Sequence, residues 1–276
     1  MADAAVCPSI KTPLFTQAAF CYKIIIEIKT KGWFILQRIM GHLRRAVTDY
    51  NMISPHDKIA VGLSGGKDSI ALLVSLARSR SFLVEGGYEL VAIMVDMGFE
   101  PNADHSAVIS LCESLGVSLK IVPTQIGEIV FSERKEPNPC SLCSRMRRGT
   151  LVNEAQALGC NKLALGHHLD DAVETFMMSL TQEGRLNCFS PVTELEDKSL
   201  SVIRPLIYAS ESEIGRAVRK SGIEIVKSRC PADGQTSRER MKQKLREQEK
   251  ADHGLKDRIF GAICRSGLFG WKEPSR

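Results

Sequence analysis

The sequence lacks any apolar run long enough to cross a bilayer. A membrane-spanning helix needs about 18 or more consecutive apolar residues, and the 276 residues contain no such run. The most apolar N-terminal stretch, Ala18 to Leu36, is interrupted by four charged residues, and the opening MADAAVCPSI has none of the features of a secretory signal. These absences predict a cytoplasmic protein with no membrane partner. In that compartment its nine cysteines are expected to be thiols or metal ligands, not disulfides.

Aromatic residues are also scarce, at 6% of the chain, whereas hydrophobic residues make up 43% and charged residues 25%. This mixture is typical of a globular protein and argues against disorder. The net charge of +5 is concentrated in residues 216–250, which carry 11 Lys/Arg and 5 Asp/Glu. A basic segment on a near-neutral body indicates a polyanionic partner, nucleic acid first; a solvated helix face is the alternative.

Short β-branched runs alternate with helix-patterned segments from Lys58 onward. Five such runs predict strands, at 58–63, 90–95, 118–122, 162–165 and 200–204. Helices are predicted at 69–79, 105–115, 140–158, 170–181, 211–221 and 238–251. This alternation predicts an α/β fold, a parallel five-stranded Rossmann-like sheet with helices on both faces. Ligands of such sheets bind at the carboxyl ends of the strands.

The chain is expected to divide into three parts. Residues 1–36 form an N-terminal extension in which 23–29 (KIIIEIK) has the pattern of a short strand or hairpin arm. Apolar residues from Ile35 to Ala46 recur at helical spacing and lead into the main catalytic domain, residues 37–210. Residues 211–276 form a basic helical C-terminal segment.

A glycine turn follows the first predicted strand, in the run Ser64-Gly65-Gly66-Lys67-Asp68-Ser69. A strand, a glycine turn and a helix start together collect free backbone N–H groups around an anion. The lysine adds a positive charge, the serines can donate hydroxyl hydrogen bonds, and Asp68 is free to help hold Mg²⁺. The run is not a Walker A motif, because Val61 and Asp68 occupy positions where that motif needs glycine and Ser/Thr. A capped helix after a glycine turn is the structural alternative.

A second polar run, Gly166-His167-His168-Leu169-Asp170-Asp171, follows the fourth predicted strand. One interpretation is that Asp170 and Asp171 contact Mg²⁺ or ATP, with His167 nearby. The other is that an aspartate caps the helix that follows and that both histidines lie on the surface.

The cysteines include one CxxC, Cys140 to Cys143, which is followed by Arg145, Arg147 and Arg148. A helix N-terminus and these cations are expected to lower the pKa of both thiols. Three interpretations compete. A dithiol redox pair would lack a thioredoxin-like context, and a zinc site would need Cys230 and a histidine as further ligands. A [4Fe–4S] cluster could be held by Cys140, Cys143 and Cys230, with one iron open.

The run SGGKDS resembles the PP-loop of ATP pyrophosphatases. With NPCSLCSRMRRGTL, GHHLDDAVET and the triplet Arg204-Pro205-Leu206, the chain is similar to the tRNA 2-thiocytidine synthetase family from about Gln37 to Lys250. The resemblance implies an ATP-binding domain at 37–210 whose nucleotide-binding residues are Gly62, Ser64, Gly65, Gly66, Lys67, Asp68, Ser69, Val95, Met97, Gly166 and His167. The catalytic residues that it implies are Lys67, Asp68, Asp170, Asp171, Cys140 and Cys143.

The same resemblance implies a reaction and its partners. ATP would adenylate a tRNA base in the anticodon loop, at position 32, and sulfur would then replace the base oxygen. Mg²⁺ would accompany ATP, and Cys140, Cys143 and Cys230 would hold a [4Fe–4S] cluster. A cysteine desulfurase or sulfide would donate the sulfur, and a homodimer is compatible with the family. Many family members have a second CxxC where this chain has Cys230-Pro231-Ala232-Asp233, which leaves three candidate ligands.

Three other functions stay open on the sequence alone. A lysidine synthetase-like or 2-thiouridine-forming enzyme would use the same phosphate loop, although the zinc-ribbon cysteine pairs of 2-thiouridine enzymes are missing. A zinc-held RNA-binding module would use ATP only structurally. Removal of sulfur from thiolated bases would need a similar cluster.

Overall fold

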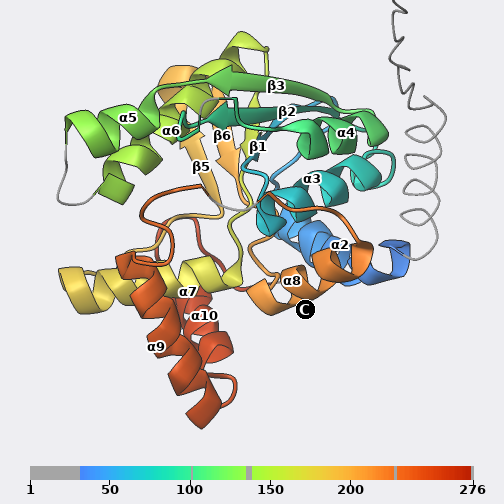
Figure 1. Cartoon of the computed structure of the whole chain (residues 1–276). Coiled ribbons are helices and arrows are strands. Elements are labelled where there is room, and N and C mark those ends of the chain that lie inside the picture. Colours follow the sequence, from blue (N-terminus) through green and yellow to red (C-terminus); the bar gives the residue numbers. More distant parts are fainter. Residues whose placement is uncertain (1–31, 101, 135–138, 227–228, 275–276) are drawn as a thin grey trace, which may run out of the picture.

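A computed structural model of the chain describes residues 32–100, 102–134, 139–226 and 229–274, and Figure 1 shows a twisted sheet with helices on both sides. The sheet has six strands in the order β3-β2-β1-β4-β6-β5. They are β1 (Lys58–Leu63), β2 (Glu89–Asp96), β3 (Ser118–Pro123), β4 (Lys162–Ala164), β5 (Val192–Leu195) and β6 (Leu200–Ile203). The strand expected at 23–29 lies outside the described residues.

The five predicted strands are confirmed, and each pairs with its neighbour in parallel. The sixth strand, β5, is an addition to the predicted five, and it pairs antiparallel with β6 at the edge of the sheet. Its sequence, VTEL, is short and only half apolar, so it shows no strand periodicity. An antiparallel edge strand on an otherwise parallel sheet is common in α/β proteins.

Helices cover the two faces of the sheet. The described helices are α2 (Gly32–Asp49), α3 (Lys67–Ser79), α4 (Ser106–Ser114), α5 (Ile126–Glu128), α6 (Pro139–Ala157), α7 (Leu169–Met178), α8 (Glu211–Ser221), α9 (Ser237–Ala251) and α10 (Leu255–Arg265), with π-helical turns η1 (Ile129–Glu133) and η2 (Ser179–Glu183) and a 3₁₀ turn η3 (Glu196–Lys198). The helical pattern that begins at Ile35 corresponds to α2, and the six helices predicted after it correspond to α3, α4, α6, α7, α8 and α9. In the described parts of the chain, no helix has both the length and the apolar composition to span a membrane.

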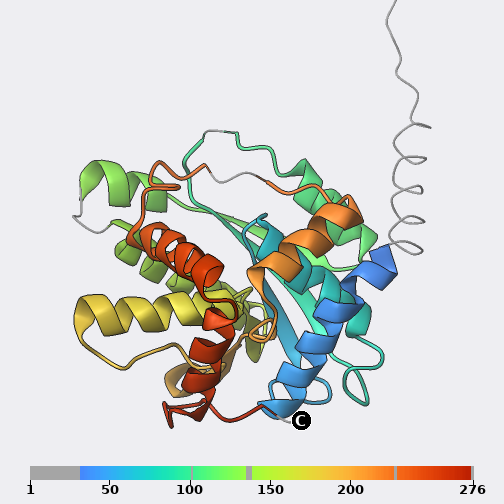
Figure 2. The same cartoon turned by 90° about the horizontal axis from the view of Figure 1, so that it is seen from below.

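The core has two halves, one on each face of the sheet. In β1, Ile59, Val61 and Leu63 contribute to the larger half, which also contains residues of α2, α3 and α8. Ala60 points to the opposite half, which contains residues of α6. The period-2 alternation of a strand thus gives β1 two buried faces. The C-terminal helices α9 and α10 pack against α7, beside the sheet (Figure 2).

Truncation of Leu72 is expected to lower the free energy of unfolding by about 3 kcal/mol. The side chain lies in α3, is 0% exposed and belongs to the larger half of the core, so Leu72→Ala leaves a cavity there. Leu186, 66% exposed, is the matched control, and its change to alanine should cost less than about 0.5 kcal/mol. Urea unfolding of both variants measures the difference; equal costs would contradict this description of the core.

Candidate active site

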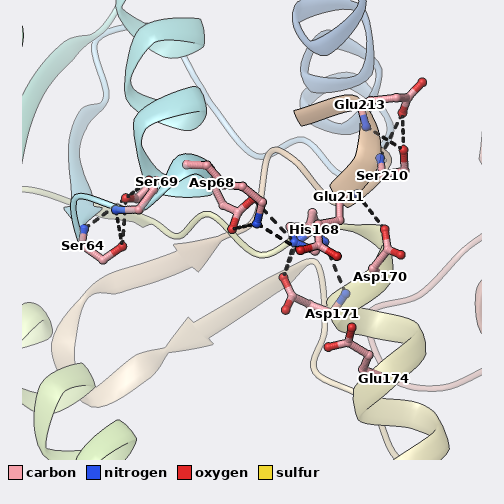
Figure 3. Close-up of polar contacts among 12 residues, drawn as sticks. Ser64, Asp68, Ser69, His168, Asp170, Asp171, Glu174, Ser210, Glu211 and Glu213 are labelled. Atoms are coloured by element: carbon pink, nitrogen blue, oxygen red, sulfur yellow. Dashed lines mark hydrogen bonds and ion pairs between the residues drawn. The ribbon is translucent and has the colours of Figure 1, made fainter. Parts of the chain in front are cut away.

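The phosphate loop lies between the carboxyl end of β1 and the first turn of α3, as predicted. The Ser69 hydroxyl accepts a hydrogen bond from the Ser64 N–H at 3.1 Å, lies 3.0 Å from the Ser64 hydroxyl and donates to the Gly66 carbonyl at 3.0 Å (Figure 3). Gly65 has a φ of +76°, and a Cβ added there would lie 2.9 Å from the Cβ of Val226. The loop therefore needs glycine both for its left-handed backbone and for the close approach of the segment that precedes Cys230.

A cluster of charges lies beside this loop. The Nζ of Lys67 is 3.0 Å from Oδ2 of Asp68 and 3.2 Å from Oε1 of Glu211, which also accepts a hydrogen bond from Lys242 at 2.6 Å. Burial alone would lower the pKa of Lys67, but the two carboxylates outweigh it and raise that pKa. Lys67 is thus a protonated lysine at neutral pH. The sequence did not allow Glu211 to be predicted as a site residue, because no motif around it indicates contact with the phosphate loop.

The turn after β4 packs directly on the phosphate loop. A Cβ at Gly166 would lie 3.0–3.2 Å from backbone atoms of Asp68 and Ser69. The helix α7 that follows is capped by His168, whose Nδ1 accepts from the Asp171 N–H at 3.4 Å, while the Asp171 carboxylate accepts from the His168 N–H at 3.0 Å. The prediction that an aspartate is the N-cap was therefore wrong. The alternative of two surface histidines was wrong for His168, which is buried.

Two carboxylates, Asp68 and Asp171, face each other across His168 (Figure 3). The His168 Nε2 is 3.7 Å from Oδ1 of Asp68 and 3.4 Å from Oδ2 of Asp171. The Oδ1 of Asp68 is buried and has no hydrogen-bond partner in the described part of the chain. Burial favours the neutral acid of Asp171, but His168, Arg238 and the His168 N–H hold the pKa of Asp171 below its ordinary value. A cation-binding pair is consistent with this arrangement, since Mg²⁺ prefers carboxylate oxygens.

Asp170, predicted to act together with Asp171, points elsewhere. Its carboxylate accepts hydrogen bonds from the Glu211 N–H at 2.7 Å and from the Lys256 Nζ at 2.6 Å. Asp170 is buried and joins α7 to α8 and α10. The structure does not bring Asp170 into the cavity with the other predicted residues, and its position fits a structural role.

Glu174 is a second acid that the sequence did not single out. It lies on α7, buried, with Oε2 3.9 Å from Nε of Arg238. Burial and the charge of Asp171 raise the pKa of Glu174 to about 7. The pair of Glu174 and Arg238 forms because α9, which carries Arg238, packs against α7.

One cavity of about 530 Å³ opens at the carboxyl ends of the strands and brings most of the predicted nucleotide-site residues together. Those that line it are Gly62, Ser64, Gly66, Asp68, Ser69, Val95, Met97, Gly166, His167 and Asp171. Gly65 is part of the loop backbone, and Lys67 lines an adjoining polar pocket of about 160 Å³ together with Asp68 and Asp171.

Two of the three predicted cluster ligands line this same cavity. Cys143 from α6 and Cys230 both line it, together with Arg147 and Arg148, and Cys140 lies one turn before Cys143 on α6. Burial raises the pKa of the Cys143 thiol, with smaller contributions from Cys230 and Cys140. The expected lowering was therefore wrong for Cys143, since the charge of Arg147 does not offset burial. Within the described residues, no three His, Cys, Asp or Glu side chains are gathered tightly enough to ligate a metal ion.

Comparisons with known proteins place these features in context. The model of the PP-loop domain matches residues 37–249. The tRNA-cytidine(32) 2-sulfurtransferase of Pelobacter propionicus is 38% identical over 83% of this chain and 86% of its own length, and that of Geobacter sulfurreducens is 37% identical over 82% and 89%. The solved U34-tRNA thiolase NcsA from Methanococcus maripaludis, with its [4Fe-4S] cluster, superposes with a TM-score of 0.67 at 27% identity, over 84% of this chain and 79% of that one.

Proposed function

This chain belongs to the PP-loop domain family and, within it, to the tRNA-cytidine(32) 2-sulfurtransferases, and on that premise we propose that it converts cytidine 32 of a tRNA to 2-thiocytidine with ATP. One observation carries the proposal: a single cavity is lined by the phosphate loop, through Ser64 and Ser69, and by the thiols of Cys143 and Cys230. A lysidine synthetase-like enzyme needs the loop but no thiols. A reaction that activates the oxygen of a base with ATP and then replaces it with sulfur needs the loop and the thiols in one cavity.

The phosphate loop binds ATP and prepares its α-phosphorus for attack. The N–H groups at the start of α3 donate hydrogen bonds to phosphate oxygens, while the hydroxyls of Ser64 and Ser69 hold the loop in shape around them. The C2 carbonyl oxygen of cytidine attacks the α-phosphorus, the bond to the bridging oxygen breaks, and pyrophosphate leaves with the bonding electron pair. Lys67 stabilises the charge that develops on this leaving group. The base oxygen now belongs to an AMP leaving group.

Asp68 and Asp171 are the residues that we assign to Mg²⁺. Their carboxylates are the hard oxygen donors that this ion prefers, and Oδ1 of Asp68 accepts no hydrogen bond from any residue that the structure describes. When bound, Mg²⁺ would neutralise phosphate charge. Asp170 has no part in this assignment, because it does not line the cavity and its carboxylate joins α7 to α8 and to Lys256.

Cys140, Cys143 and Cys230 are the residues that we assign to a [4Fe–4S] cluster. Thiolates are the ligands of such clusters, and three of them leave one iron open to an exogenous ligand. When bound, the cluster would present sulfide from an outside donor to the activated base, and that sulfur would replace the base oxygen. We further propose sulfide or a cysteine desulfurase as the sulfur source, the cytoplasm as the compartment and a homodimer as the assembly.

Basic side chains around the cavity would hold the tRNA backbone. Arg145, Arg147 and Arg148 of α6 are exposed, as are Arg240 and Lys244 of α9. Arg238 and Lys242 of the predicted basic segment are instead paired internally, with Asp171 and Glu211. The exposed set therefore carries the electrostatic contribution to binding.

Binding of tRNA is expected to weaken steeply with salt. Each neutralised phosphate contributes about one unit to the slope of log affinity against log salt concentration. The double variant Arg147→Ala, Arg148→Ala should reduce that slope by about 2. Fluorescence anisotropy at several salt concentrations measures it, with exposed Arg258→Ala of α10 as the control. A double variant with an unchanged slope would remove these arginines from the tRNA-binding surface.

Deletion of the gene tests the function as a whole. Mass spectrometry of tRNA nucleosides from the deletion strain should show no 2-thiocytidine, and the wild-type gene should restore it. Loss of a thiouridine or of lysidine instead would assign the chain to the corresponding branch. Unchanged nucleosides, with zinc in the purified protein, would favour a binding module.

A further inference from the structure

The imidazole of His167 is fixed from one side by Arg204, a residue outside the cavity lining. The Nε of Arg204 lies 3.2 Å from Nδ1 of His167, and the His167 ring stacks on Phe189 with 5.1 Å between centroids. The other ring nitrogen, Nε2, has no hydrogen-bond partner in the described residues, and His167 lines the 530 Å³ cavity. The ring therefore presents Nε2 as its free polar atom.

Arg204 is itself held rigidly. Its side chain extends from the end of β6, is only 5% exposed and lies 4.8 Å over the Phe189 ring. Its NH1 donates to the Ser190 carbonyl at 2.6 Å and to the Thr193 hydroxyl at 3.2 Å. The antiparallel strand β5 and the chain before it thus anchor the guanidinium. Of the hydrogen-bond partners that Arg204 has in the described part of the chain, His167 is the one that lines the cavity.

The hydrogen bond between these two residues decides where the imidazole proton lies. A guanidinium has only donors, so Nδ1 must offer its lone pair, and the proton of the neutral ring is then on Nε2. Burial and the charge of Arg204 outweigh the opposing charge of Asp171, and they lower the pKa of His167 to about 4. The ring is therefore neutral at physiological pH, and its free nitrogen is a donor.

His167 lines the same cavity as Ser64 and Ser69 of the phosphate loop. Its neighbour Gly166 packs on the backbone of Asp68 and Ser69, at the helix start where phosphate oxygens are expected. We propose that Arg204 is a positioning residue that fixes His167 as an Nε2–H donor to a non-bridging oxygen of the α-phosphate during adenylation. This inference rests on the proposed function. A preorganised donor stabilises charge on that oxygen as the base attacks, whereas an unfixed ring would present a repelling lone pair part of the time.

The tautomer can be observed directly, without activity. In full-length protein labelled with ¹⁵N-histidine, the His167 signals, assigned by their loss in His167→Asn, should be those of an Nε2–H tautomer at neutral pH. Arg204→Met should move them toward the averaged shifts of a ring that exchanges between tautomers. An Nδ1–H tautomer or an imidazolium in the wild type, or unchanged shifts in Arg204→Met, would overturn the inference.

A pair of isosteres tests the role of the donor. His167→Asn keeps an acceptor for Arg204 but has no group at the Nε2 position, whereas His167→Gln can place an amide N–H there. We expect His167→Asn to lower the kcat of tRNA-dependent pyrophosphate release by about 10²-fold with little change in KM for ATP, and His167→Gln to recover about tenfold of that loss. Equal rates for His167→Asn and wild type, or a loss confined to KM, would overturn it.

Adenylation of the base and the positioning of His167 by Arg204 can be disproved separately. Wild-type protein that releases no pyrophosphate with any tRNA would contradict the proposed adenylation, while the ¹⁵N spectrum would still decide whether Arg204 fixes the ring. If the wild-type protein releases pyrophosphate and substitution of His167 does not change that rate, only the proposed role of His167 and Arg204 is contradicted.

Discussion

Replacement of Cys230 by serine is expected to abolish thiolation while leaving ATP binding unchanged. Cys230 lines the cavity but contributes no atom to the phosphate loop, so its loss should remove a cluster ligand and no atom of that loop. Serine is a poor iron ligand compared with a thiolate. Iron and sulfide per chain should fall from about four each to a small fraction of that after oxygen-free purification.

The chain supplies a matched control for this variant. Cys160 is a buried thiol of the second half of the core and does not line the cavity, so Cys160→Ala should keep its iron. Cys140→Ser and Cys143→Ser should behave like Cys230→Ser. Full iron content and thiolation in Cys230→Ser would exclude this residue as a ligand and remove the main reason for assigning a cluster to these three cysteines.

Replacement of Lys67 by alanine is expected to slow tRNA-dependent pyrophosphate release by 10²–10³-fold, roughly the effect of removing one charge-stabilising group from an active site. Lys67 is protonated, half-buried and adjacent to Asp68, at the first residue of α3. Glu211 keeps Lys242 and Arg246 as partners in the variant, so the surrounding structure should persist.

The measurement for this variant is phosphate release after pyrophosphatase coupling, at saturating tRNA. Exposed Lys120 on the edge strand β3 is the control, and Lys120→Ala should release pyrophosphate at the wild-type rate. Wild-type rates in Lys67→Ala would mean that the leaving pyrophosphate does not depend on this side chain and would contradict the proposed position of ATP.

Local sequence was sufficient for the parts of the site built by consecutive residues. The glycine turn between β1 and α3 contains hydrogen bonds among residues 64–69, close together in the sequence, and its prediction was confirmed. The difference between Asp170 and Asp171 depends instead on α8 and on Lys256, which is 86 residues away. No pattern within the GHHLDD run indicates which of the two carboxylates lines the cavity.

Other features depended on residue types that rarely have the role they have here. Histidine is not among the preferred N-cap residues, so His168 could not be distinguished from a surface histidine. The raised pKa of Cys143 follows from burial, which spacing does not report. The bond between Arg204 and His167 joins the ends of β6 and β4, neighbours in the sheet but 37 residues apart.

The most direct test of the central claim follows the base oxygen. A tRNA that carries ¹⁸O at C2 of cytidine 32 is incubated without oxygen with the protein, Mg·ATP and sulfide, and the AMP is analysed by mass spectrometry. Adenylation of the base predicts that one ¹⁸O appears in AMP for each 2-thiocytidine formed. Unlabelled AMP alongside 2-thiocytidine would show that the base oxygen never bonds to the α-phosphorus, and would contradict the mechanism.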